Sequence, residues 1–485
     1  MTNSHYFHKE ELVEILDSCI NKTLGEVDVN NVFDKTKEKP KITGIAGDVI
    51  EQSVLGYPAD TRQEPDLNID GIKTELKTTG LKYKNDNKTF VAKEPMSITA
   101  VSPEKIINET FSDSNFWHKL AHILFVYYLY DSPTTVKAAN YANFPIKGYQ
   151  FHEFDEEDKE ILKNDWMTVR DFIKELQENY EDYENEYPRI SYELRPKLMY
   201  IDTAPKWPNR PRFRLKRALV TSIVQEHFGE KLEQLPGKYT TYKSIDETCH
   251  ELTEKYSHKT IEELKNIFNI PEKRVNKSIG EIIIINMFGG KSKRMQQIEL
   301  FRKSGIIGKT ITLTKDGRRT EDMKLFNIDF NEIENEDIEF EESQFYEYFT
   351  NNHLCIIFEE PSNEAPLKDN VFLGFKWVTF DEKFIEENVK PIWEDIRDKV
   401  NNKKLKETPV LKKDGTPRIN KLGNVITSLN FPKSSEGNIF VRGSGKDSNS
   451  KPLTINGIDM YLQYIWIKGS YMAERVKNTN FIRYE

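Results

Sequence analysis

Two carboxylates and a lysine near residue 70 have types and a spacing suited to phosphodiester chemistry. The segment PDLNIDGIKTELKTTG contains an Asp-Gly dipeptide at 70–71, which favours a two-residue hairpin turn with positive φ at both positions. A turn there places Asp66 directly opposite Glu75, roughly 5 Å away at Cβ. Lys77 lies two residues beyond Glu75, so it points to the same face of the strand.

Like charges that face each other across a hairpin are destabilising, so a compensating cation is expected. Mg²⁺ is commonly held by one or two carboxylates together with waters and phosphate oxygens. A lysine beside it can orient or help deprotonate the attacking water and stabilise developing charge. The pattern therefore indicates a metal-dependent phosphodiesterase with Asp66 and Glu75 as Mg²⁺ ligands. An exposed hairpin of mixed charge is the alternative that the pattern alone leaves open.

The same segment begins like a calcium-binding EF-hand loop. Asp66, Asn68 and Asp70 alternate, and Gly71 follows where such a loop needs its glycine. The twelfth position should be a bidentate glutamate, and here it is Lys77. A lysine repels calcium, which argues against a calcium-binding module.

The composition describes a globular protein of two or three domains. The chain has 485 residues, 37% of them hydrophobic, and a formal charge of −9. We expect no membrane span and no signal peptide, and the three scattered cysteines favour a cytoplasmic location without disulfides or a zinc site. The net charge argues mildly against nucleic acid, but residues 206–217 (KWPNRPRFRLKR) form a local basic segment.

Two further segments frame the hairpin. GIAGDVIEQSVLG (44–56) has the apolar periodicity of a helix and carries Glu51 inside its apolar stripe, where a buried acid needs a partner. The segment FWHKLAHILFVYYLYD (116–131) indicates a helix end that runs into a buried strand, with Lys119 just before the apolar run.

Five motifs in this order resemble the MutH mismatch-repair endonuclease and its relatives, the two-domain restriction enzymes of the Sau3AI type that cut at GATC. They are GIAGDVIEQSVLG, PDLNIDGIKTELKT, HKL (118–120), ELRPK (193–197) and RFRLKRALVTSIVQEHF (212–228). The resemblance implies an α/β fold of the restriction-endonuclease type, with a central mixed sheet flanked by helices. It implies a catalytic set of Asp66, Glu75, Lys77, Glu51 and Lys119, and a DNA-contact set that includes Arg195, Lys197, Arg214 and Lys216.

Two departures from the MutH pattern matter. The spacing from Asp66 to Glu75 is two residues longer, which leaves Asp70 as a weaker candidate ligand. Arg214 stands where MutH has a tyrosine that senses adenine methylation, so a response to methylation is not implied.

The second half of the chain repeats the order of the first. The segments 154–173, 46–56 and 213–224 recur as 380–400, 279–289 and 465–476. In this alignment Ile284 and Ile307 replace Glu51 and Glu75, and Lys309 matches Lys77. The nearest residue to an Asp66 equivalent is Glu299. Two isoleucines cannot hold Mg²⁺, so the copy is expected to keep the fold without its chemistry. Lys468 aligns with Lys216, and Arg442 aligns near Arg195, which makes both candidate DNA contacts.

These patterns predict a catalytic domain at 1–230, a linker at 231–257 and a catalytically inert, DNA-binding and allosteric domain at 258–485. The leading hypothesis is a type II restriction endonuclease that binds double-stranded DNA, possibly at two sites at once, as a monomer that DNA can dimerise. A MutH-like nickase of hemimethylated DNA and a non-catalytic DNA-binding module are the alternatives.

Overall fold

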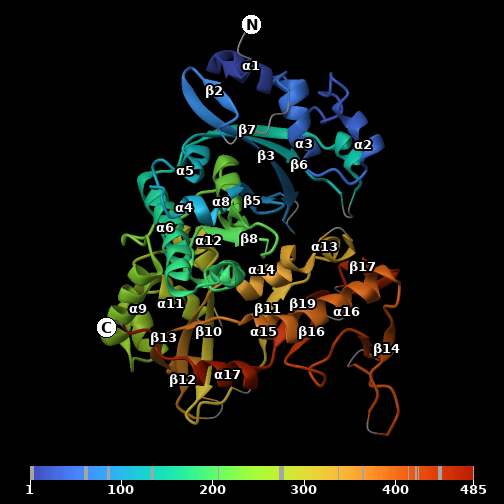
Figure 1. The fold of residues 1–485 in the computed structure, drawn as a ribbon. Coiled ribbons are helices and arrows are strands. Elements are labelled where there is room, and N and C mark those ends of the chain that lie inside the picture. Colours follow the sequence, from blue (N-terminus) through green and yellow to red (C-terminus); the bar gives the residue numbers. More distant parts are fainter. Residues whose placement is uncertain are drawn as a thin grey trace.

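In the computed structural model, two sheets with the same plan follow each other along the chain (Figure 1). The structure describes residues 5–58, 64–84, 88–132, 136–205, 207–271, 278–319, 321–336, 338–362, 365–412, 414–420, 423, 425–445 and 451–483. No helix within these ranges is long and apolar enough to cross a membrane. The mixed sheets flanked by helices confirm the expected fold class.

The first half is built on a mixed sheet in the order β1-β2-β3-β6-β7, with β4 paired to β3. Strand β3 runs parallel to β6, and β6 runs antiparallel to β7. The seven residues of β6 are all buried, which explains why its sequence ILFVYYL is continuously apolar. A second, antiparallel sheet has the order β5-β9-β8. The strands are β1 (Tyr6–Phe7), β2 (Leu67–Ile69), β3 (Ile72–Tyr83), β4 (Phe90–Ala92), β5 (Met96–Ala100), β6 (Ile123–Leu129), β7 (Ile146–His152), β8 (Ile201–Ala204) and β9 (Arg212–Leu215).

Helices cover both faces of this sheet. The longest is α6, whose buried stripe includes Trp166 and Val169, and whose first turn is capped by the side chain of Asp155. The helices and helical turns are α1 (Lys9–Asp17), η1 (Val32–Asp34), α2 (Lys35–Glu38), α3 (Ile45–Val49), η2 (Ile50–Val54), α4 (Pro103–Ile106), α5 (Asn115–Leu120), η3 (Ala138–Asn143), α6 (Glu156–Asn179), η4 (Tyr183–Glu186), α7 (Arg189–Tyr192), η5 (Arg195–Lys197) and α8 (Arg217–His227).

The second half repeats the β3-β6-β7 part of the first sheet as β10-β12-β13, and the sheet β5-β9-β8 as β11-β19-β16. Parallel and antiparallel pairings follow the same order, and even the irregularities recur, because the register shift at Tyr127 in β6 has its counterpart at Ile357 in β12. The strands are β10 (Ile307–Thr314), β11 (Met323–Asn327), β12 (His353–Glu360), β13 (Val371–Val378), β14 (Glu407–Pro409), β15 (Thr427–Leu429), β16 (Ile439–Ser444), β17 (Leu453–Ile455), β18 (Ile458–Met460) and β19 (Leu462–Ile467).

The helices of the second half complete this repeat. Ser343 caps α14 in the way Ser114 caps α5, with each side chain accepting from a backbone N–H three residues on. They are α9 (Tyr242–Tyr256), α10 (Ile261–Ile267), α11 (Ile279–Met287), η6 (Met295–Gln297), α12 (Glu299–Ser304), α13 (Phe330–Glu334), η7 (Phe340–Glu342), α14 (Gln344–Thr350), η8 (Leu367–Asp369), α15 (Glu382–Phe384), η9 (Ile385–Val389), α16 (Lys390–Asn401) and α17 (Gly469–Lys477).

The two halves share a hydrophobic core. One cluster of buried side chains extends from β5, α6 and α8 through α9, α11 and α12 to β12 and β13. The segment 231–257, which the sequence suggested as a linker, contains α9, and its Ile245 and Cys249 are buried in this shared core. The indole of Trp377 on β13 also donates to Asp246 of α9 at 2.6 Å. This segment therefore packs as part of the body.

Candidate active site

The hairpin around residue 70 forms with the register expected from its Asp-Gly turn. Leu67 pairs with Thr74, and Ile69 pairs with Ile72. Asp70 and Gly71 have φ values of 49° and 90°, as a turn of type I′ requires. The predicted turn and pairing are confirmed, and they bring the residue before β2 next to Glu75 on β3.

Glu75 is the centre of a buried charged cluster. Its side chain is 2% exposed, and its Oε1 accepts from Lys77 Nζ at 2.7 Å. Lys119 Nζ contacts both carboxylate oxygens of Glu75 at 2.9 Å. A carboxylate this far from water needs charged hydrogen-bond partners, and two ammonium groups supply them. The structure thus joins three of the five predicted catalytic residues.

Asp66 lies beside this cluster. Its Oδ2 accepts from the backbone N–H of Leu76 at 3.0 Å. Burial, and secondly the charge of Glu75, raise the pKa of Asp66, and the nearby Lys77 and Lys119 only partly oppose that rise. A buried acid that is repelled by a neighbouring carboxylate marks a site where a divalent cation would be stabilising. The donors are hard oxygens, which suit Mg²⁺.

Lys119 reaches Glu75 because of the short helix α5. This helix begins after Ser114, whose hydroxyl accepts from the N–H of Trp117 at 3.2 Å, and it ends just before β6. Strand β6 pairs with β3 in parallel, with Ile123 opposite Glu75. The last turn of α5 therefore stands at the end of the β3–β6 pairing that begins with Glu75 and Ile123.

Glu51 lies on the helix that packs against β3. Helix α3 continues into the π-helical turn η2, which contains Glu51, and π-turns within helices are frequent at functional sites. Gly47 of the same helix faces Thr78, the residue after Lys77. Thr78 and Glu75 point to opposite faces of β3 because side chains alternate along a strand. Participation of Glu51 at the site stays a prediction.

A second acidic group lies elsewhere, at the junction of the halves. Among the described residues, the acidic trio whose oxygens come together closely enough for one ion is Asp155, Asp158 and Glu299. Lys303 already lies among them, 2.9 Å from Asp158 Oδ2 and in contact with Glu299. Its ammonium group offsets part of their negative charge, so the structure shows an ion-pair cluster at this place.

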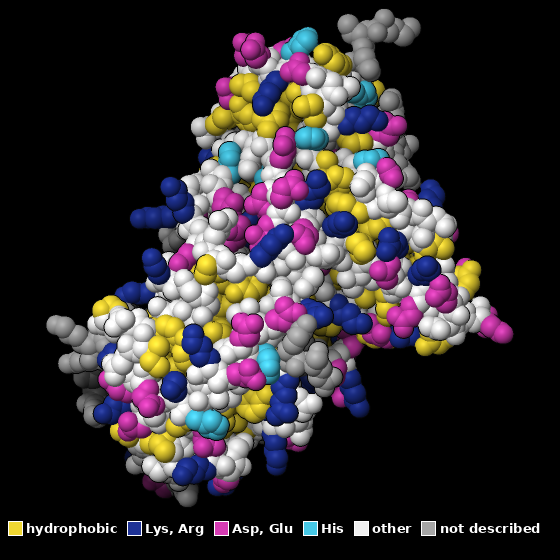
Figure 2. All heavy atoms as spheres, turned by 90° about the vertical axis from the view of Figure 1, so that its left-hand side faces the viewer, with side chains coloured by type: hydrophobic (Ala, Val, Ile, Leu, Met, Phe, Trp, Pro, Cys, Tyr) yellow, Lys and Arg dark blue, Asp and Glu magenta, His cyan; other side chains and the backbone are white. Residues whose placement is uncertain are grey.

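The surface charges of both halves are mixed. Figure 2 shows the face on the left-hand side of Figure 1, where Lys and Arg side chains are interspersed with Asp and Glu side chains over the whole length of the molecule. Such a surface, on a chain with a formal charge of −9, gives no broad attraction for phosphate on this face. Binding of DNA therefore depends on local groups of cations, such as those that the sequence predicts near residues 195 and 214.

The four predicted DNA contacts of the first half gather at one end of the β8–β9 pair. Lys216 donates its backbone N–H to Tyr200 and its Nζ to the carbonyl of Leu198, at 2.9 and 2.6 Å. Arg214 forms a two-point ion pair with Asp202 at 2.8 and 3.1 Å. Burial lowers the pKa of Lys216. Burial by itself would lower the pKa of Arg214 as well. The ion pair with Asp202 outweighs this effect of burial, so the pKa of Arg214 is raised.

The other two members of this group lie on the turn η5. The guanidinium of Arg195 stands over the ring of Tyr346, 4.6 Å from its centroid, and Tyr346 belongs to α14 of the second half. Lys197 is exposed and lies 5.7 Å from the ring centroid of Phe172. All four cations thus have intramolecular partners, and Lys197 is the only exposed one among them.

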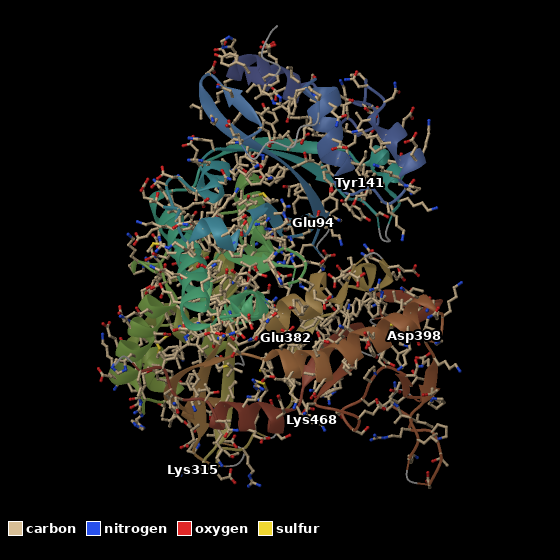
Figure 3. The ribbon with its side chains drawn as sticks, in the orientation of Figure 1. Glu94, Tyr141, Lys315, Glu382, Asp398 and Lys468 are labelled. Carbon is tan, nitrogen blue, oxygen red and sulfur yellow. The ribbon has the colours of Figure 1, made fainter. Side chains whose placement is uncertain are left out.

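In the second half, Lys468 holds the position of Lys216. Each residue precedes a helix, and each donates its N–H at 2.9 Å to the residue before the neighbouring strand, Asn438 and Tyr200 respectively. Figure 3 places Lys468 in the lower part of the molecule, within the second half. The predicted equivalence of these two lysines is confirmed.

The alignment of Arg442 with Arg195 is wrong. Arg442 pairs with Tyr464 in the β16–β19 ladder, at the place that Ala204 holds opposite Arg212 in the β8–β9 ladder. The residues between α16 and β16 are more numerous than those between α6 and β8, and this inserted length shifted the alignment. Arg442 is exposed and forms an ion pair with Asp322 at 3.0 Å.

The position of the catalytic cluster is preserved in the second half without its acids. Ile307 stands opposite His353, as Glu75 stands opposite Ile123, and Lys309 stands opposite Cys355, as Lys77 stands opposite Phe125.

The matched serine caps put Tyr348 at the place of Lys119, which the sequence comparison missed. The pattern F-x-x-S-x-F at 111–116 and 340–345 was the signal that could have found it. Lys309 Nζ lies 5.7 Å from the ring centroid of Tyr348. Burial lowers the pKa of Lys309 to about 8.

Comparison with known proteins agrees with this geometry. Residues 55–165 match the family model of the DNA mismatch repair enzyme MutH. Over 98% of its length the chain is 26% identical to the type II restriction enzyme Sau3AI of Staphylococcus aureus, and the match covers 99% of that protein. The range matched by the MutH model contains Asp66, Glu75, Lys77 and Lys119, and the longer match extends the similarity through both halves.

Proposed function

We propose that this chain, a member of the family of MutH and Sau3AI-type restriction endonucleases, cuts double-stranded DNA at a short specific site with Mg²⁺ as cofactor. One observation supports this proposal most directly. Lys77 and Lys119 hold the buried carboxylate of Glu75, and Asp66 lies beside it with a raised pKa. Carboxylates beside lysines can hold a divalent cation, orient a water molecule and stabilise the charge that develops during hydrolysis of a phosphodiester.

Each residue of the cluster has a distinct role in this proposal. Asp66 and Glu75 would hold Mg²⁺, which supplies positive charge next to the scissile phosphate. Lys77 is 21% exposed and Lys119 is 11% exposed, so Lys77 is the ammonium nearer to solvent. Lys77 orients the attacking water and stabilises charge on the phosphate oxygens. Lys119 contacts both oxygens of Glu75 and therefore fixes the orientation of that carboxylate.

We further propose that the second half, residues 258–485, is a pseudo-nuclease that binds a second DNA site and stimulates the first half. Two observations support this role. The second half keeps the fold and Lys468, and it has Ile307 and Tyr348 where the first half has Glu75 and Lys119. For such a stimulation, bound effector DNA must favour an active arrangement of the two halves. The resemblance implies GATC as the site and ends with 5′ overhangs. The chain would act as a monomer that DNA can bring together in pairs.

Plasmid cleavage tests the function. The full chain, incubated with Mg²⁺ and a plasmid, should produce linear DNA, and sequencing of the ends should show one short site with 5′ overhangs. EDTA should stop the reaction. Plasmids with two sites should be cut faster than plasmids with one, and a short uncleavable duplex should accelerate the one-site reaction. Nicked circles as the final product would instead support a nickase, and equal rates on both plasmids would argue against an effector site.

The candidate DNA contacts give a separate prediction. Arg195→Ala should weaken binding about equally on all sequences and reduce the salt slope by roughly one unit, as expected for a residue that binds a phosphate. Arg214→Ala should lose roughly 1–3 kcal/mol of discrimination between the specific and a random duplex. Asp202→Asn serves as the control, because it removes the charged partner of Arg214 but keeps the guanidinium. Fluorescence anisotropy in EDTA measures binding without cleavage. Unchanged affinity in both arginine variants would exclude this face from DNA binding.

A further inference from the structure

The segment between α16 and β16 differs most between the two halves. In the first half, residues 180–200 cross from α6 to β8 as the short turns η4, α7 and η5. In the second half, residues 402–438 make the same crossing, and part of them forms a two-stranded ribbon of β14 and β15. Figure 1 shows this ribbon in orange at the lower right, standing away from the body. We define the described residues between 406 and 429 as the arm.

The base of the arm is fixed to the protein. Leu405 and Phe431, which flank the arm, are 6% and 3% exposed and belong to the core of the second half. Asn430 accepts from the N–H of Lys406 at 2.8 Å and donates its own N–H to the carbonyl of Lys406 at 3.1 Å. The ribbon is thus held in one place relative to the second half.

The far end of the arm exposes apolar side chains. Leu411 and Ile419 are 56% and 58% exposed, and Val425 and Ile426 are 46% and 38% exposed. Within the described part of the chain after residue 271, every large apolar side chain that is classed as exposed lies in this arm. Leu411 pairs with Pro417 and Ile419 pairs with Val425, so the arm presents two apolar pairs. Such a concentration of exposed apolar side chains marks a binding site.

The arm is also basic within an acidic protein. Residues 406–426 (KETPVLKKDGTPRINKLGNVI) contain five Lys or Arg and two Asp or Glu, a net charge of 5 − 2 = +3, whereas the whole chain carries −9. Both acids are already engaged, since Glu407 pairs with Lys451 at 3.2 Å and Asp414 accepts from Thr416 at 2.9 Å. Lys412 and Arg418 are exposed beside the apolar pairs. This combination fits a polyanion that also has an apolar interior.

We propose that the arm binds double-stranded DNA, with its apolar end in the minor groove and with Lys412 and Arg418 on the flanking phosphates. This inference rests on the proposed function in that it takes DNA as the partner. Proteins that use the minor groove insert Leu, Ile or Pro between base steps, whereas direct readers of the major groove use side chains that form hydrogen bonds. Leu411, Pro417 and Ile419 are of the first kind. The arm also occupies the crossing that holds Arg195 and Lys197 in the first half.

Two double variants of the full chain test the arm. Lys412→Ala/Arg418→Ala should reduce the salt slope of duplex binding by roughly two units, one for each cation removed from a phosphate. Leu411→Ser/Ile419→Ser should keep the slope, weaken binding about tenfold and abolish the bend of a duplex labelled at both ends, measured by energy transfer. All binding is measured in EDTA, where no cleavage occurs. The matched controls are Lys22→Ala and Val29→Ser, both exposed in the first half.

The outcomes distinguish a failure of the arm proposal from a failure of the proposed function. Cleavage in Mg²⁺ is measured on the same proteins. If the full chain fails to cut but the arm variants lose affinity, the arm is supported and the nuclease proposal fails. If the full chain cuts and the arm variants equal the controls in affinity, slope and bend, the arm proposal is overturned. A change of sedimentation with the Leu411→Ser/Ile419→Ser variant and no change in DNA binding would also overturn it, because the apolar end would then cover a second copy of the chain.

Discussion

Replacing Glu75 with alanine is expected to abolish DNA cleavage while DNA binding survives. Glu75 is proposed to share Mg²⁺ with Asp66 and is the common partner of Lys77 and Lys119. Loss of a metal ligand removes several kcal/mol of charge stabilisation, and roughly 4 kcal/mol corresponds to about a 10³-fold lower rate. Single-turnover cleavage of a labelled duplex measures the rate, and anisotropy in EDTA measures the binding.

Glu75→Ala leaves two ammonium groups close together in a buried place, which can destabilise the fold. A loss of cleavage in this variant must therefore be distinguished from a loss of folding. Glu75→Gln keeps the shape and the hydrogen-bond acceptor, and its thermal unfolding midpoint should stay closer to that of the parent. Asp66→Ala should lose cleavage by a similar factor. Asp70→Asn is the matched control, because asparagine tolerates the positive φ of the turn and the Asp70 carboxylate is already bonded to the N–H of Lys9 and to His8, at 3.0 and 2.7 Å. Normal cutting by Asp66→Ala with loss in Asp70→Asn would overturn the ligand assignment.

Lys77 gives an internal check on the same cluster. Lys77→Ala should be inactive, and Lys77→Arg should not restore activity, because the guanidinium is bulkier and stays protonated. A Lys77→Arg variant that cuts at the parent rate would show that this position supplies positive charge alone, without a more specific role at the water.

The hairpin could be predicted because its geometry is decided by neighbouring residues. Positive φ at Asp70 and Gly71 selects the turn, the turn fixes the register, and the register brings Asp66 close to Glu75. The partner of Arg214 could not be predicted in this way. Asp202 reaches Arg214 only because β8 and β9 pair, and the residues between these two positions do not predict that pairing.

In the repeated half, too, only those features that depend on neighbouring residues could be predicted from the sequence. Lys216 and Lys468 could be matched because each stands next to the helix that follows it, in segments that align without a gap. Arg442 could not, since the arm adds residues before β16 and shifts the match. The stacking of Arg195 on Tyr346 joins the two halves, and a comparison of one half with the other holds no information about how they pack together.

The junction of the halves gives the prediction with the largest expected effect on stability. Lys303 of α12 is 4% exposed and lies 2.9 Å from Asp158 of α6, whose other oxygen accepts from the hydroxyl of Tyr200 at 2.8 Å. Lys303→Ala should destabilise the protein by about 3–5 kcal/mol, because it leaves an acid buried without its counter-charge. The urea midpoint of the full chain measures this loss. Because α6 and α12 belong to different halves, the loss should loosen their junction before either sheet unfolds.

A double variant decides whether the ion pair itself is stabilising. Burial raises the pKa of Asp158, and the charge and hydrogen bond of Lys303 oppose that rise. Asp158→Asn/Lys303→Met removes both charges, keeps an acceptor for Tyr200 and should therefore be far closer to the parent in stability than Lys303→Ala. Lys174→Ala is the control, since its pair with Glu178 is more than half exposed and should contribute less than about 1 kcal/mol. A decrease in stability of Lys303→Ala no larger than that of this control would show that water enters the junction and solvates Asp158.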